Sequence, residues 1–121
     1  MIKRRKKQKP RKTRSNKAID KLLLKQWADT IKQRDNYTCQ ICKKNLKNNP
    51  KAINAHHILP KSIKELRYNM LNGITLCSYC HIYGSYSAHT NALYFAYWLK
   101  INKPLQYNKL MNILLTILSF K

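Results

Sequence analysis

The cysteines of this chain form two C-x-x-C pairs, and this pattern constrains the fold more than any other feature. Cys39 and Cys42 enclose Gln-Ile, and Cys77 and Cys80 enclose Ser-Tyr, with a long insert between the pairs. Each pair can turn both thiolates toward one point, and two pairs complete a tetrahedral shell of sulfurs around Zn²⁺. A closed shell leaves no open coordination position, so the sequence predicts a structural zinc that clamps residues 52–76 as a loop.

Two other uses of the cysteines stay open at this point, a pair of disulfides and a redox C-x-x-C of the thioredoxin type. The redox use lacks the surrounding β-α-β pattern. The basic N-terminus is not followed by an apolar stretch and a cleavage site, so we expect no secretory signal and a reducing cytoplasm. The longest apolar run, residues 113–120, is far shorter than the ~20 residues that span a bilayer. We therefore expect no membrane segment.

The charge balance predicts a polyanionic partner. The chain of 121 residues has 25 Lys and Arg against 4 Asp and Glu, which gives a net charge of +21. DNA or RNA is the first candidate, with an anionic membrane surface a distant second. Residues 1–17 are a block of like charges, which predicts a disordered basic arm that binds DNA. The alternative is a localisation signal or a solubilising tail.

The apolar spacing predicts a helix that begins at a cap on Ser15 or Asn16 and ends near Asp35. The residues of its apolar face are Leu23, Leu24, Trp27, Ala28 and Ile31. Three short strands are expected after it, at residues 37–43, 52–59 and 74–77, the last of them behind an Asn72-Gly73 turn.

A helix is expected after Cys80, interrupted near Gly84 and resumed over residues 90–100. Residues 101–121 predict a C-terminal amphipathic helix that packs on the core or on the partner in a homodimer. Its apolar stripe consists of Leu110, Ile113, Leu114, Ile117 and Leu118.

All four histidines lie inside or just after the clamped loop. Two of them, His56 and His57, are neighbours, and the others are His81 and His89. Neighbouring side chains on a strand point to opposite faces, so His56 and His57 are poorly placed to chelate one ion together. One of them can instead bind a metal while the other accepts a proton. Such an array suits metal-assisted hydrolysis.

The segments "RDNYTCQIC", "AHHILP" and "LNGITLCSYCH" together resemble the HNH endonucleases of the ββα-metal class, in the variety that a four-cysteine zinc stabilises. The likeness runs from about Trp27 to Leu99. It implies an α+β fold, a small ββα-metal (HNH) core stapled by the zinc site, with flanking N- and C-terminal helices. The nuclease domain would cover residues 18–100. The segment "SAHTNALYFAYWLK" is also similar to small phage recombination nucleases of the NinG/Rap kind.

The resemblance implies a role for each matching residue. His57 corresponds to the general base that activates water, and Asn72 to the residue that braces the loop between the strands. His56 and His81 correspond to ligands of the catalytic ion. Many relatives have a further histidine at the position of Ser85.

His89 lies eight residues beyond His81, so it reaches the ion only if the helix is interrupted, as Gly84 permits. Lys43 stands where relatives often have glycine after the first cysteine pair, a change that we expect to be harmless. An imidazole-rich set of donors favours Mn, Ni or Zn, whereas the family often uses Mg.

The sequence therefore predicts a divalent-metal-dependent HNH endonuclease that hydrolyses DNA phosphodiester bonds. We expect phosphate contacts from Arg34, Lys61, Lys64 and Arg67. The setting would be a phage or another mobile element acting in the cytoplasm of a bacterial host, with no small-molecule substrate. The alternatives are a non-catalytic zinc-ribbon protein that binds nucleic acid and a junction-selective recombination nuclease.

Overall fold

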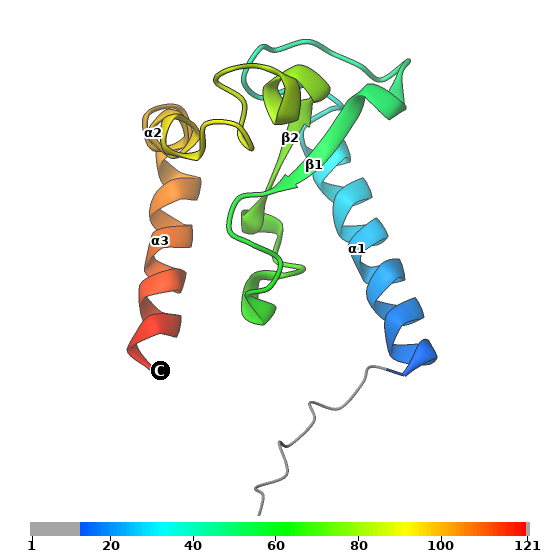
Figure 1. Cartoon of the computed structure of the whole chain (residues 1–121), viewed down its shortest axis with the longest axis vertical. Helices are drawn as coiled ribbons and strands as arrows, with labels where there is room; N and C mark the ends of the chain where they lie inside the picture. Colours follow the sequence, from blue (N-terminus) through cyan, green and yellow to red (C-terminus); the bar gives the residue numbers. More distant parts are fainter. Residues whose placement is uncertain (1–12, 121) are drawn as a thin grey trace, which may run out of the picture.

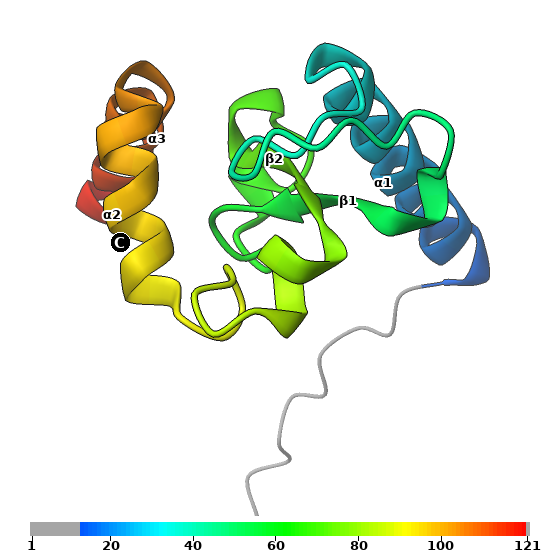
Figure 2. The same ribbon diagram turned by 90° about the horizontal axis from the view of Figure 1, so that it is seen from above.

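A two-stranded antiparallel sheet lies between one long helix and a pair of C-terminal helices (Figures 1 and 2). The structure, a computed structural model, describes residues 13–120. Its main elements are α1 (Arg14–Arg34), β1 (Ile53–His57), β2 (Gly73–Cys77), α2 (Ala92–Asn102) and α3 (Pro104–Ser119). This arrangement confirms the predicted α+β class with a small ββα core and flanking helices. The first twelve residues of the predicted basic arm lie outside the described residues.

Helix α1 begins at Arg14 because the side-chain oxygen of Thr13 accepts a hydrogen bond from the Asn16 amide at 3.3 Å. The prediction of a cap at Ser15 or Asn16 was therefore wrong by two or three residues. Trp27 and Ile31 are the buried residues of this helix. Only its C-terminal half thus packs on the sheet.

The sheet pairs Ile53 with Cys77 at one end and His57 with Gly73 at the other. Every residue of β2 is buried. A Cβ atom on Gly73 would lie 1.7 Å from Cδ1 of Ile31 and 2.7 Å from Cζ2 of Trp27. Gly73 is therefore required for the close approach of α1 to β2, and its backbone is extended, at φ −138°.

The predicted strand at residues 37–43 was wrong, because the segment is a series of turns with a single bridge between Thr38 and Asn45. Tyr37 and Lys43 have φ values of 52° and 65°. The Lys43 amide donates to the Cys39 carbonyl at 2.9 Å. Left-handed residues at both ends of the segment fold it back on itself, which an extended strand cannot do.

A five-residue helical turn of the π type, η4 (Tyr79–Tyr83), follows β2 and ends at Gly84. The predicted interruption at Gly84 is thus confirmed. The Asn91 side chain accepts from the Tyr94 amide at 3.1 Å and so caps α2, and Pro104 occupies the first turn of α3. No helix within residues 13–120 is long and apolar enough to cross a membrane.

The main apolar core joins the cysteine pairs, β2 and α2. Its buried members are Cys39, Ile74, Leu76, Cys77, Cys80, Ala88, Phe95 and Leu99. Helix α3 contributes the buried Leu110, and its Gln106 amide donates to the carbonyls of Leu71 and Gly73 at 2.8 and 2.9 Å. Leu118 of the predicted stripe is 52% exposed, so only part of the stripe packs on the core.

Candidate metal centres and active site

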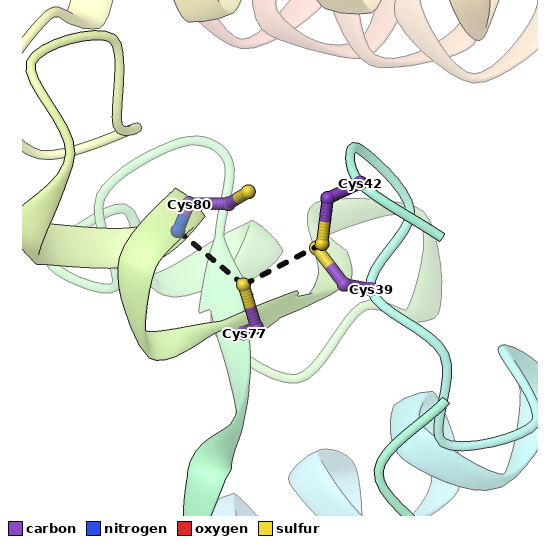
Figure 3. Close-up of side chains that lie close together, drawn as sticks. All are labelled: Cys39, Cys42, Cys77 and Cys80. Carbon is purple, nitrogen blue, oxygen red and sulfur yellow. Dashed lines mark hydrogen bonds between the residues drawn. The ribbon is translucent and has the colours of Figure 1, made fainter. Parts of the chain in front are cut away.

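Four sulfur atoms from two distant segments converge at one point (Figure 3). They all lie within 4.8 Å of one another, and the Sγ atoms of Cys42 and Cys77 are 3.7 Å apart. With Zn–S bonds of about 2.3 Å, the edge of a tetrahedral sulfur shell is about 3.8 Å. None of the four cysteines forms a disulfide. The residues therefore form a site that is positioned to bind a metal ion, as the sequence predicts for zinc.

The electrostatics of this cysteine site also favour a bound cation. Burial raises the pKa of the Cys80 thiol, and the charge of Cys39 raises it further. Burial also acts to raise the pKa of the Cys39 thiol. Hydrogen bonds from backbone groups, chiefly those of Cys77 and Cys42, outweigh burial, so the pKa of Cys39 is lowered. Since close thiolates repel one another, they ionise together only where a positive charge offsets the repulsion. A metal ion bound by the four cysteines would supply this charge.

Three histidines form a second cluster of possible metal ligands. His56 lies on β1, His81 on η4, and His89 on the loop that follows Gly84. One ring nitrogen from each lies within 4.8 Å of the others, and the Nε2 atoms of His81 and His89 are 3.0 Å apart. The structure therefore brings together all the histidines for which the sequence predicted an ion-binding role.

The loop after Gly84 returns His89 to His81 by backbone pairing. The Ala88 amide donates to the Cys80 carbonyl at 2.9 Å, and the His89 amide donates to the His81 carbonyl at 3.0 Å. His89 thus lies beside η4 although eight residues separate it from His81.

Two donors of this cluster, His56 and His81, favour the neutral form. Burial first, and then the nearby His81 and His89, lower the pKa of His56 to about 3. Burial likewise lowers the pKa of His81, whose Nδ1 atom is buried without a hydrogen-bond partner. Neutral imidazoles are the form that coordinates divalent metals. The chemistry of the three donors thus fits a transition-metal ion.

His57 is held apart from this cluster by two other contacts. Its ring stacks on Trp27 with centroids 3.8 Å apart and planes at 11°. Its Nε2 atom lies 2.9 Å from the Arg67 carbonyl, which can only accept, so Nε2 donates and Nδ1 retains a lone pair. Burial lowers the pKa of His57. The ring is therefore neutral and carries a nitrogen that can accept a proton.

Asn72 is fully buried and joins the loop after β1 to the start of β2. Its Oδ1 atom accepts from the Leu59 amide at 2.7 Å, and its Nδ2 atom donates to the carbonyls of Leu59 and Leu66 at 2.9 and 3.1 Å. The side chain thus fixes the loop that leads from His57 toward Arg67.

Arg67 is bound to an acidic residue that the sequence analysis missed as part of the site. Its Nε and Nη2 atoms donate to the Asp20 carboxylate at 2.8 and 2.6 Å, and Nη1 donates to the Lys61 carbonyl at 3.0 Å. The Tyr68 hydroxyl also donates to Asp20. Asp20 is one of only four acidic residues in the chain, and that scarcity was the signal available in the sequence.

The four basic residues predicted to contact phosphates lie in two separate parts of the structure. Lys61, Lys64 and Arg67 line a groove of about 550 Å³ beside the N-terminal half of α1. Arg34 lies elsewhere, and its guanidinium donates to the Asp35 carboxylate and to the carbonyls of Met70 and Gly73. The contacts of Arg34 thus hold the end of α1 against the start of β2.

A two-stranded sheet followed by a helical turn, with a four-cysteine site and clustered histidines, defines a small ββα-metal domain. Residues 39–83 match the family model of the HNH endonucleases. The matched segment includes both cysteine pairs and every histidine except His89. Neither the curated proteins nor the solved structures contain a match to the chain.

Proposed function

We propose that the chain is a divalent-metal-dependent endonuclease that hydrolyses DNA phosphodiester bonds. The observation that carries this proposal is the separation of the histidines into two groups. His56, His81 and His89 bring three ring nitrogens within 4.8 Å of one another, whereas His57 is held by Trp27 and the Arg67 carbonyl. Such a division supplies ligands for an ion and, beside them, a base for water.

In this proposal His57 accepts a proton from the attacking water on its free Nδ1 atom. The stack on Trp27 and the hydrogen bond to the Arg67 carbonyl fix the ring, so its lone pair keeps one direction. A divalent ion bound by the three histidines would polarise the scissile phosphate and stabilise the charge of the leaving 3′ oxygen. Asn72 keeps the intervening loop in place through its three hydrogen bonds.

The metal is proposed to be Mn, Ni or Zn, with Mg as the alternative that the family resemblance favours. Within the described residues, the cluster offers imidazole nitrogens and no carboxylate. Imidazole suits transition metals, whereas Mg prefers oxygen ligands. The rate of cleavage should therefore be higher with Mn, Ni or Zn, which imidazole suits, than with Mg.

DNA is proposed as the substrate because the chain carries a net charge of +21 and because Lys61, Lys64 and Arg67 line one groove near His57. These residues would contact phosphates and position the backbone without reading the sequence. A phage or another mobile element in the bacterial cytoplasm remains the predicted setting.

The central experiment measures nicking of supercoiled plasmid by the wild type and by His57→Ala, with Mg, Mn, Ni or Zn in turn. We expect the variant to lose activity by about 10²–10⁴-fold, the usual contribution of a general base. It should retain its zinc and its affinity for DNA. Tyr97→Ala is the matched control, because Tyr97 is 62% exposed on α2. This variant should cleave DNA as fast as the wild type does.

Two results would contradict the proposal. His57→Ala could cleave as fast as the control, which would exclude His57 as the base. Alternatively, wild-type protein with every metal could leave plasmid, linear and branched DNA intact while still binding them. That second result would identify a non-catalytic module that binds nucleic acid.

A further inference from the structure

One cavity of the described chain opens directly onto the histidines. It has a volume of about 680 Å³ and lies between β1 with its following loop on one side and α2 with α3 on the other. His56 and His57 of β1 line it, together with His81 and His89. Any group that occupies this cavity therefore lies next to the proposed reacting phosphate.

The opposite side of the cavity is apolar. Phe95 of α2 and Tyr107, Leu110 and Leu114 of α3 line it, and the Phe95 ring meets the His56 ring edge to face at 5.3 Å between centroids. Ala92 and Ala96, one helical turn apart on α2, are exposed and line the cavity with small side chains. The walls thus suit a flat, apolar ligand.

The cavity is also nearly free of charge in a chain that is otherwise densely basic. Lys61 is the only lysine or arginine among its lining residues, and no carboxylate lines it. Almost all the basic residues within residues 13–120 thus lie elsewhere. An intact duplex presents phosphates on its outside, and these require cations rather than apolar walls. An unpaired base presents a π-face, which stacks on aromatic and apolar side chains.

We propose that this cavity binds the base of an unpaired nucleotide beside the scissile phosphate. The preferred substrate would then be DNA with an unpaired nucleotide, such as a bulge, a flap or a single strand, rather than continuous duplex. This inference rests on the proposed nuclease function and specifies its substrate. An unpaired base enters such a pocket more readily because no pairing has to be broken first.

The test compares two DNAs of one sequence, a perfect duplex and the same duplex with one unpaired nucleotide. For the wild type, kcat/KM should be at least about tenfold higher with the unpaired nucleotide, since extrusion from an intact stack is costly. Ala96→Trp places a large ring at a lining position of the cavity, so the ratio of the two rates should fall toward one. Leu93→Trp is the matched control, because Leu93 is 84% exposed on the same helix and does not line the cavity.

A binding measurement separates this inference from the nuclease proposal. With 2-aminopurine at the unpaired position, wild type and Leu93→Trp should change its fluorescence, and Ala96→Trp should not. If no DNA is cleaved but this pattern holds, the cavity inference stands and the nuclease proposal fails. Equal cleavage of both DNAs by the wild type would overturn the inference and leave the nuclease proposal intact.

A second copy of the chain is the competing occupant of the cavity. Sedimentation of the wild type and Ala96→Trp without DNA tests this directly. A wild-type dimer that Ala96→Trp converts to monomer would overturn the proposal. Monomers of both proteins, together with the fluorescence pattern above, would support it.

Discussion

Asp20 and Arg67 form a bidentate ion pair that connects α1 to the residue whose carbonyl holds His57. The carboxylate accepts from Nε and Nη2 at 2.8 and 2.6 Å, and the Arg67 carbonyl accepts from His57 at 2.9 Å. Both side chains are largely shielded, with Asp20 21% and Arg67 19% exposed. Asp20 is therefore a positioning residue for the proposed base.

Replacing Asp20 with asparagine should lower kcat by about ten- to hundredfold, because a small displacement of a catalytic group costs this much. The effect should fall on kcat more than on KM, as measured by plasmid nicking at several DNA concentrations. Asp29→Asn is the control on the same helix, since Asp29 pairs with Lys25 in an exposed ion pair. Equal kcat for the two variants would exclude the positioning role.

Replacing Asn72 with aspartate should destabilise the protein by about 3–5 kcal/mol, because a buried charge would face two carbonyl oxygens. The Nδ2 atom donates to the carbonyls of Leu59 and Leu66. In aspartate an oxygen atom, which accepts, would replace this nitrogen. Urea denaturation followed by circular dichroism measures the loss. Asn112→Asp makes the same change at an exposed position of α3 and should shift stability by less than about 0.5 kcal/mol. Similar losses for both variants would contradict this account.

Replacing Lys43 with glycine should stabilise the protein by about 0.5–1 kcal/mol, in contrast to the expectation that this departure from the family pattern is harmless. Its φ of 65° lies in the left-handed region, which costs a residue with a Cβ about 1–2 kcal/mol. The gain is offset in part by the greater freedom of glycine in the unfolded chain.

Lys44→Gly is the matched control for this change, since it removes the same charge at a neighbouring residue that does not have positive φ. It should lower the melting temperature, whereas Lys43→Gly should raise it. A lower melting temperature for both variants would show that the left-handed backbone carries no strain.

Removal of the metal from the cysteine site should unfold the domain. Structural zinc sites contribute about 10–16 kcal/mol, which equals or exceeds the total stability of a small domain, about 5–15 kcal/mol. We expect one equivalent of zinc in the purified protein, and loss of the cooperative melting transition after treatment with a strong chelator. Adding zinc should restore that transition.

Two substitutions distinguish the two proposed metal centres. Cys42→Ser should lower the zinc content, because it removes one of the four sulfur ligands. His89→Ala should retain the structural zinc and lose metal-dependent cleavage instead. If the protein still melts cooperatively after treatment with the chelator, its folding does not depend on a metal at the cysteine site.

Local chemistry made several features predictable from the sequence. Two cysteines in a C-x-x-C pair are close along the chain, so their sulfurs meet in almost any compact turn, and two such pairs predict a metal shell. The alternation of side chains along a strand similarly separates His56 from His57. These features depend on neighbours in the sequence and on little else.

The other features of the candidate site depend on contacts between residues that are distant in the sequence. Asp20 and Arg67 are 47 positions apart, and no local pattern pairs them. Trp27 was expected on the apolar face of its helix, but its stack on His57 requires α1 to pack against the sheet. His89 joins the histidine cluster because the backbone turns at Gly84 and pairs with η4. Packing energies between separate elements decide such contacts, and these energies cannot be read from the residues of one segment.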